Sequence, residues 1–190
     1  MKARRHLLLV VILTSAVGLS IYRMVKHQKV EYPYGVSHCC IDAMELALNL
    51  YAQDHGGAYP AGESSPEASL SLLCKSNYTD AGTIRGMTVP ESSVRGILER
   101  GGLLGPQNCG WQYVEGLTPA DDPRMALLYC KEPLGHNGQR TKDGGRQVLF
   151  AGNGGIQWIS GDQWPSFLSE QRELLRSRNE NRKESQPSVH

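Results

Sequence analysis

The chain is 190 residues long and nearly balanced in charge, with 20 lysines and arginines against 19 acidic residues. This length suits one domain with a modest core, and the balanced charge provides no strong field for nucleic acid, so nucleic-acid binding is excluded from the expected functions. Twenty-one glycines and ten prolines against only two phenylalanines predict a fold rich in turns.

The first thirty residues form a hydrophobic segment between basic flanks. An uncharged run covers residues 7–22, and basic residues stand on both sides of it, at Lys2, Arg4, Arg5, Arg23, Lys26 and Lys29. As a helix this run would measure roughly 24 Å, short of the ~30 Å hydrocarbon core, but flanking basic side chains can reach the interface and close the gap. We therefore expect residues 1–30 to be a signal anchor that crosses a membrane once through residues 7–22. A signal peptide that is cleaved after export is the alternative.

Five cysteines lie beyond this segment, at Cys39, Cys40, Cys74, Cys109 and Cys130. An exported domain meets an oxidising compartment, so one or two disulfides are expected. The odd number leaves at least one thiol free or paired between chains, and the connectivity stays open.

Helical patterns predominate in the first half of the expected exported domain, residues 31–176. Residues 37–55 have a helical period, with Ser37 as the expected cap and two glycines directly after the last turn. Ser65, placed before a proline and a glutamate, predicts the start of a second helix over residues 66–76. We expect a third, brief helix at residues 91–100, among glycines and prolines that interrupt any longer period.

Strands are expected after residue 110, at 111–114, 124–130, 147–151 and 156–159. The last two are joined by Gly152-Asn153-Gly154-Gly155, a turn whose residues tolerate positive φ. A final helix from about residue 162 presents an apolar face, and the polar tail that follows, residues 177–190, is expected to be disordered. Helices with one apolar stripe must bury it, and a three-stranded antiparallel meander supplies the surface, so the pattern predicts an α+β fold.

Two segments resemble the pilin-like proteins known as pseudopilins of type II secretion. Residues 47–60, ALNLYAQDHGGAYP, are similar to the end of the family's first helix, with its Tyr, Asp, glycines and Tyr-Pro. Residues 136–159, HNGQRTKDGGRQVLFAGNGGIQWI, resemble the family's late strand-turn-strand. The family's prepilin peptidase motif, a Gly before Phe-Thr-Leu and a Glu in the first helical turn, is absent.

This resemblance implies a pilin-like domain, with helices packed on a small antiparallel sheet, behind an N-terminal membrane helix. It implies an inner-membrane protein with a single span and a C-terminal domain in the periplasm or outside the cell. It also implies a structural or interaction role beside other pilin-like or secretion-system proteins, in a type II secretion or type IV pilus-like assembly. An exported soluble module that binds a ligand after signal cleavage is the alternative.

No catalytic, cofactor or metal motif stands out, so we expect no enzyme and no bound cofactor. The chain lacks Gly-x-Ser-x-Gly, His-Glu-x-x-His and a phosphate-binding glycine loop with Lys. A metal cluster of His38, Cys39, Cys40 and His55 is not expected, because the spacing of these residues matches no zinc pattern. A cysteine-based site with His136 and Asp143 is not expected either, because exported cysteines are more often bridged and a histidine in a loop is usually solvated.

A structural role is also expected for the oxygen-bearing residues of the late loops and for the tryptophans. The resemblance suggests calcium in the late loops, where oxygen ligands are available from Asp121, Asp122, Asp143 and Asn153, but turn formation is the preferred interpretation of these residues. Trp158, within a strand, and Trp164, on the final helix, are expected in the core rather than on a binding face.

Overall fold

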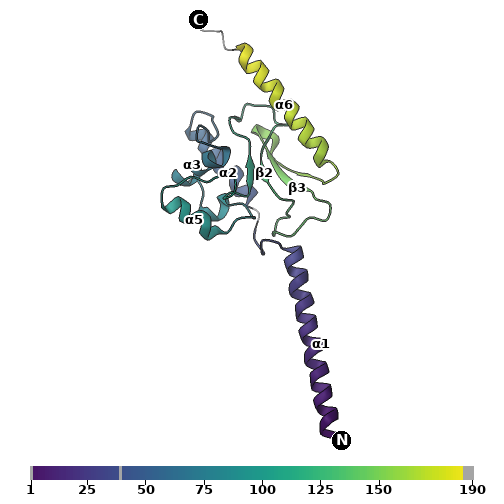
Figure 1. Cartoon of the computed structure of the whole chain (residues 1–190). Coiled ribbons are helices and arrows are strands. Elements are labelled where there is room, and N and C mark those ends of the chain that lie inside the picture. The colour runs from purple at the N-terminus through teal and green to yellow at the C-terminus, as the bar shows by residue number, and fades with distance from the viewer. Residues whose placement is uncertain (1, 39, 186–190) are drawn as a thin grey trace.

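The computed structural model describes residues 2–38 and 40–185, with side chains from residue 13 to residue 184 except residue 39. It confirms an α+β fold, in which a long helix, α1 (Lys2–Glu31), precedes a body of helices and strands (Figure 1). The helices of the body are α2 (Ile41–Asp54), α3 (Pro66–Lys75), α4 (Ala81–Ile84), α5 (Glu91–Glu99) and α6 (Trp164–Ser185). The strands are β1 (Trp111–Tyr113), β2 (Ala126–Cys130), β3 (Arg146–Phe150) and β4 (Ile156–Ile159).

The strands form one antiparallel meander in the order β1-β2-β3-β4, so the sheet has four strands rather than the expected three. The first strand joins the edge because Trp111 pairs with Cys130 and Tyr113 with Leu128. β2 is apolar along its length because both of its faces are covered by helices. Leu127 belongs to the main core with α2 and α3, whereas Ala126 packs on the opposite side with Phe167 of α6.

The first body helix, α2, starts later than the sequence suggests. The expected cap, Ser37, is wrong: the N-cap is Cys40, which makes no side-chain capping bond, and the Ser37 hydroxyl instead accepts a hydrogen bond from Arg85. The expected end is confirmed, because Gly56 and Gly57 both take positive φ just after the helix.

The next helices follow the sequence prediction with one addition. Ser65 caps α3 by accepting a hydrogen bond from Ala68 N at 3.1 Å, as expected, and α5 begins at the expected residue. No sequence pattern predicts α4, a single turn whose start is capped by Asp80, which accepts a hydrogen bond from Thr83 N at 2.8 Å. Four residues are too few to produce a helical period in the sequence.

The last helix, α6, continues to Ser185, past the residue at which we expected a polar tail to begin. Two side chains hold it on the body. Gln171 accepts a hydrogen bond from Ala126 N at 2.7 Å and donates one to Arg124 O at 2.9 Å, and Arg178 makes a bidentate ion pair with Asp121. Arg178 lies beyond residue 176, so the helix remains attached to the body there despite the polar composition of this segment.

The tryptophans divide between core and surface. Trp111 is fully buried, and Trp164 is half-buried on α6, where the guanidinium of Arg146 lies 4.0 Å from its ring centroid. The expectation that Trp158 lies in the core is wrong, because its side chain is 48% exposed. It stands on β4, the edge strand, and only Ile156 and Ile159 of that strand pack against the two cores.

The turn between β3 and β4 is the expected hairpin, closed by a short 3-10 turn at Gly152–Gly154. Gly152 has φ +54° and Gly155 has φ +63°, values that L residues rarely adopt. A Cβ at residue 152 would also lie 2.4 Å from the carbonyl oxygen of Pro119, while a Cβ at residue 155 would meet nothing within 4 Å. Gly152 therefore also permits a close approach of two loops.

We expect Gly152→Ala to destabilise the protein more than Gly155→Ala. Both changes force an alanine into positive φ, which costs about 1–3 kcal/mol. Only Gly152→Ala adds a collision with Pro119, so it should lower the free energy of unfolding more. Chemical denaturation of the two variants measures the free energies of unfolding, and equal losses would contradict the close approach.

Candidate functional site

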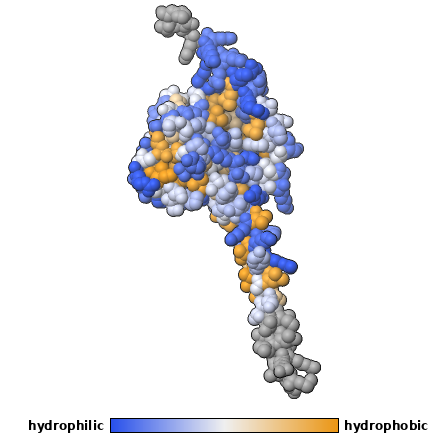
Figure 2. All heavy atoms as spheres, viewed as in Figure 1, coloured by the Kyte–Doolittle hydropathy of each residue, from blue (hydrophilic) through white to orange (hydrophobic). Residues whose placement is uncertain are grey.

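The most conspicuous surface of the molecule is the helix α1, which extends away from the body (Figure 1). Its described apolar side chains are solvent-exposed, and Figure 2 shows them along the stalk below the body. They are Leu13, Val17, Leu19, Ile21, Tyr22, Met24, Val25 and Val30. At its C-terminal end the helix meets the body, where Glu31 O accepts a hydrogen bond from Arg140 N at 2.7 Å. An apolar surface of this kind on a protein is typical of an interaction site.

The length of apolar helix that the structure describes is limited. Among the described residues, no helix is both long and apolar enough to cross a membrane. The N-terminal part of the expected membrane segment, residues 7–12, lies outside the described side chains, whereas residues 13–22 lie within them and are exposed.

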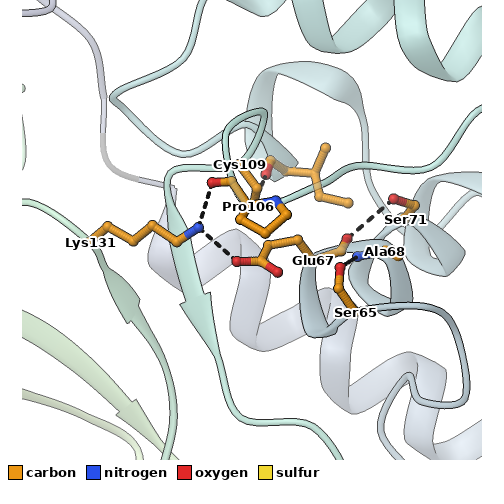
Figure 3. A network of polar contacts seen from close by, with 8 residues as sticks. Ser65, Glu67, Ala68, Ser71, Pro106, Cys109 and Lys131 are labelled. Atoms are coloured by element: carbon orange, nitrogen blue, oxygen red, sulfur yellow. Dashed lines mark hydrogen bonds and ion pairs between the residues drawn. The ribbon is translucent and has the colours of Figure 1, made fainter.

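A buried ion pair joins α3 to the end of β2 (Figure 3). Lys131 Nζ lies 2.7 Å from Glu67 Oε1 and donates a second hydrogen bond to Pro106 O at 2.8 Å. The side chain of Glu67 is 7% exposed, and burial, the largest single effect, raises its pKa. The hydrogen bond and charge of Lys131, together with hydrogen bonds from the backbone and from Ser65, outweigh burial and bring the pKa below its usual range. A carboxylate held in this way stays ionised and is unsuited to general acid-base work.

Two cysteines of the body, the partly buried Cys74 and the buried Cys109, are unreactive thiols. Burial raises the pKa of Cys109 to about 11 and that of Cys74 to about 12, so neither forms a thiolate at neutral pH. Both are free thiols. Cys39 lies outside the described residues, and the expected disulfides stay a prediction.

The acidic residues considered for calcium are engaged elsewhere. Asp121 pairs with Arg178, Asp122 with Arg124, and Asp143 accepts from Gly145 N at 3.1 Å. In the part of the chain that the structure describes, no three histidine, cysteine or acidic side chains are grouped to hold a metal ion. A hollow of about 500 Å³ does lie between α6 and residues 120–125, and the Asp121–Arg178 ion pair occupies part of its wall.

The histidines are arranged differently from the sequence-based grouping. His38 Nδ1 lies 3.1 Å from His136 Nε2, although the two residues are 98 positions apart. His55 is not part of this pair, because its ring stacks on Tyr51 with the centroids 3.7 Å apart. No local sequence signal could have found the His38–His136 pair, since it depends on where the loop between β2 and β3 folds.

We expect Lys131→Met to lower the free energy of unfolding at pH 7 by about 1.5–3 kcal/mol, because it leaves the buried carboxylate of Glu67 without its charged partner. The pKa of Glu67 is lower in the folded state than in the unfolded state, where it is about 4.3. The ion pair therefore stabilises the fold fully above the unfolded-state pKa, and this stabilisation is lost as the pH falls through the folded-state pKa. The variant and the wild type should therefore converge in acid.

The matched control for this change is Arg124→Met, which breaks an ion pair with Asp122 on the surface. The Arg124 side chain is 67% exposed, so this loss should stay within about 0.5 kcal/mol at any pH. Urea denaturation between pH 3 and pH 8 measures both variants. A loss for Lys131→Met that does not depend on pH would show that the ion pair is not its cause.

The described residues thus contain an exposed apolar helix, an ion pair between α3 and the residue that follows β2, and a pair of facing histidines. The thiols at Cys74 and Cys109 are protonated, and the carboxylate of Glu67 is tied to Lys131. Comparison of the chain with known protein families, with curated proteins and with solved structures finds no match.

Proposed function

We propose that this chain is a membrane-anchored protein that acts through protein–protein contact, with α1 as the anchor and the body as the exported part. The observation that carries the proposal is the exposure of the apolar side chains of α1, which no described part of the chain covers. A lipid bilayer is the occupant that fits them best, because the uncharged run of residues 7–22 is bounded by basic residues on both sides.

The free energy of transfer favours a lipid bilayer over water around α1. Burying one Leu, Ile or Val side chain is worth roughly 1.5–3 kcal/mol. Leu13, Val17, Leu19 and Ile21 are each more than half exposed, so their transfer to lipid would together supply several kcal/mol. Arg23, Lys26 and Lys29 follow on the same helix and would lie at the membrane surface, where long basic side chains are favourable.

For the body we propose a pilin-like structural or interaction role, in a type II secretion or type IV pilus-like assembly at the inner membrane, with the body in the periplasm or outside the cell. The resemblance of residues 47–60 and 136–159 to pseudopilins supports it. So does the order of the elements, in which an exposed N-terminal helix precedes helices packed on an antiparallel meander. Other pilin-like or secretion-system proteins are the proposed partners.

The anchor is tested by placing lysines in it. We expect the double variant Leu13→Lys, Val17→Lys to leave the membrane fraction, because each lysine near the centre of a membrane helix costs about 2.5–3.5 kcal/mol. The matched control is Leu46→Lys, Val36→Lys, which changes the same residue types at exposed positions outside α1. Carbonate extraction of bacterial membranes, followed by immunoblotting, measures the distribution.

The wild type and the control should remain in the carbonate-resistant pellet. Wild-type protein in the soluble fraction, with an N-terminus shortened by signal cleavage, would favour the alternative of a released ligand-binding module. N-terminal sequencing of the mature protein distinguishes these two cases. Equal retention of both double variants would show that α1 does not hold the protein in the membrane.

A further inference from the structure

We propose that His38 and His136 form a chelating pair for a divalent transition-metal ion, with Zn²⁺ as the probe, at the junction between α1 and the body. Each histidine contributes one ring nitrogen, His38 Nδ1 and His136 Nε2, and both side chains are exposed. The inference stands on the geometry of this pair and does not depend on the membrane role of α1.

The separation of the two nitrogens matches that of two imidazoles on one metal ion. Zinc binds histidine nitrogens at about 2.0–2.1 Å, which places two such nitrogens roughly 3.0–3.4 Å apart at the angles found in zinc sites. The observed separation is 3.1 Å. An imidazole nitrogen that carries no hydrogen has a lone pair for a metal ion, so this pair of nitrogens supplies two ligand atoms of the right kind.

The orientation of the rings also favours a shared ion over a straight hydrogen bond. A linear N–H···N bond of this length would place the ring centroids about 5.4 Å apart. The centroids of His38 and His136 are 4.9 Å apart and the ring planes are inclined at 70°. The two rings are therefore not collinear across the 3.1 Å contact, and two imidazoles bound to one ion share this feature.

The backbone around the pair is fixed on both sides, so the two rings are held near each other before any ion binds. Ser37 N donates to Asn137 O at 3.1 Å, which pins the residues next to each histidine. Gly138 has φ +83° and lies close to Gly35: a Cβ added to Gly138 would be 2.9 Å from the carbonyl oxygen of Gly35. Such preorganisation lowers the entropic cost of chelation.

The ligand type points to zinc, copper or nickel, since imidazole suits these metals better than it suits calcium or magnesium. Two protein ligands leave open positions for water or for a ligand from another molecule, which is consistent with the exposure of both rings. Zinc is the suitable probe because it has no redox chemistry and so will not oxidise thiols.

An ion at this position would join two distant parts of the chain. His38 lies in the connector between α1 and α2, whereas His136 lies in the loop between β2 and β3, residues 131–145. The ion would add a metal bridge beside the hydrogen bond from Arg140 N to Glu31 O. It would therefore tighten the attachment of α1 to the body.

We expect the full-length protein to bind one Zn²⁺ at this pair, measured by isothermal titration calorimetry. His38→Ala and His136→Ala should each weaken the binding at least tenfold. The control is His27→Ala, which removes an exposed histidine of α1 that is not part of the pair, and it should leave the affinity unchanged. Far-UV circular dichroism checks that the variants are folded.

Two further measurements identify the ligands. Zn²⁺ should shift the ring ¹⁵N resonances of His38 and His136 in the wild type, and Cys40→Ser should retain binding, although its sulfur lies 3.7 Å from His38 O. Loss of binding in Cys40→Ser with full binding in both histidine variants would assign the metal to a thiol and overturn the proposal. Equal zinc affinity in the wild type and in both histidine variants would also overturn the proposal, because the two rings would then only form a hydrogen bond.

Discussion

The two central strands, β2 and β3, need cover on both faces, and the rest of the body is arranged to supply it. Leu127 and Leu149 face the helices that precede the sheet, whereas Ala126, Val148 and Phe150 face α6. An uncovered apolar face of a sheet would remain in water, so the C-terminal helix is as necessary to the fold as the earlier ones. The polar contacts of Gln171 then fix where that helix sits, because they satisfy backbone groups next to β2.

Much of this fold could be predicted from the sequence, because its signals are local. Ser65 before Pro66 marks the start of α3, and the glycines after α2 mark its end. The run of apolar residues predicts the central strand β2, and the Gly-Asn-Gly-Gly turn predicts the hairpin of β3 and β4. The errors arose where a tertiary contact decided the outcome. Ser37 bonds to Arg85 instead of capping α2, and Asp121 keeps α6 helical past its apolar face.

The candidate sites were less predictable, since they depend on contacts between distant segments. His38 and His136 meet only because the loop between β2 and β3 returns to the connector, and a sequence pattern restricted to neighbours groups His38 with His55 instead. The sequence suggests that the acidic residues of the late loops are available for calcium. In the structure Arg124, just before β2, pairs with Asp122, and Arg178 of α6 pairs with Asp121. The apolar run of α1 was visible in the sequence, and the structure adds that its described part lies apart from the body.

The contact between α1 and the body has a mechanical consequence. Arg140 N binds Glu31 O, and Asn137 O binds Ser37 N, so both hydrogen bonds end in the one loop that separates β2 from β3. Tension applied along α1 would therefore pass to the loop between the two innermost strands as well as along the chain to α2. A pull on α1 would therefore be shared between the helical layer, through α2, and the central strands, through the loop that connects them.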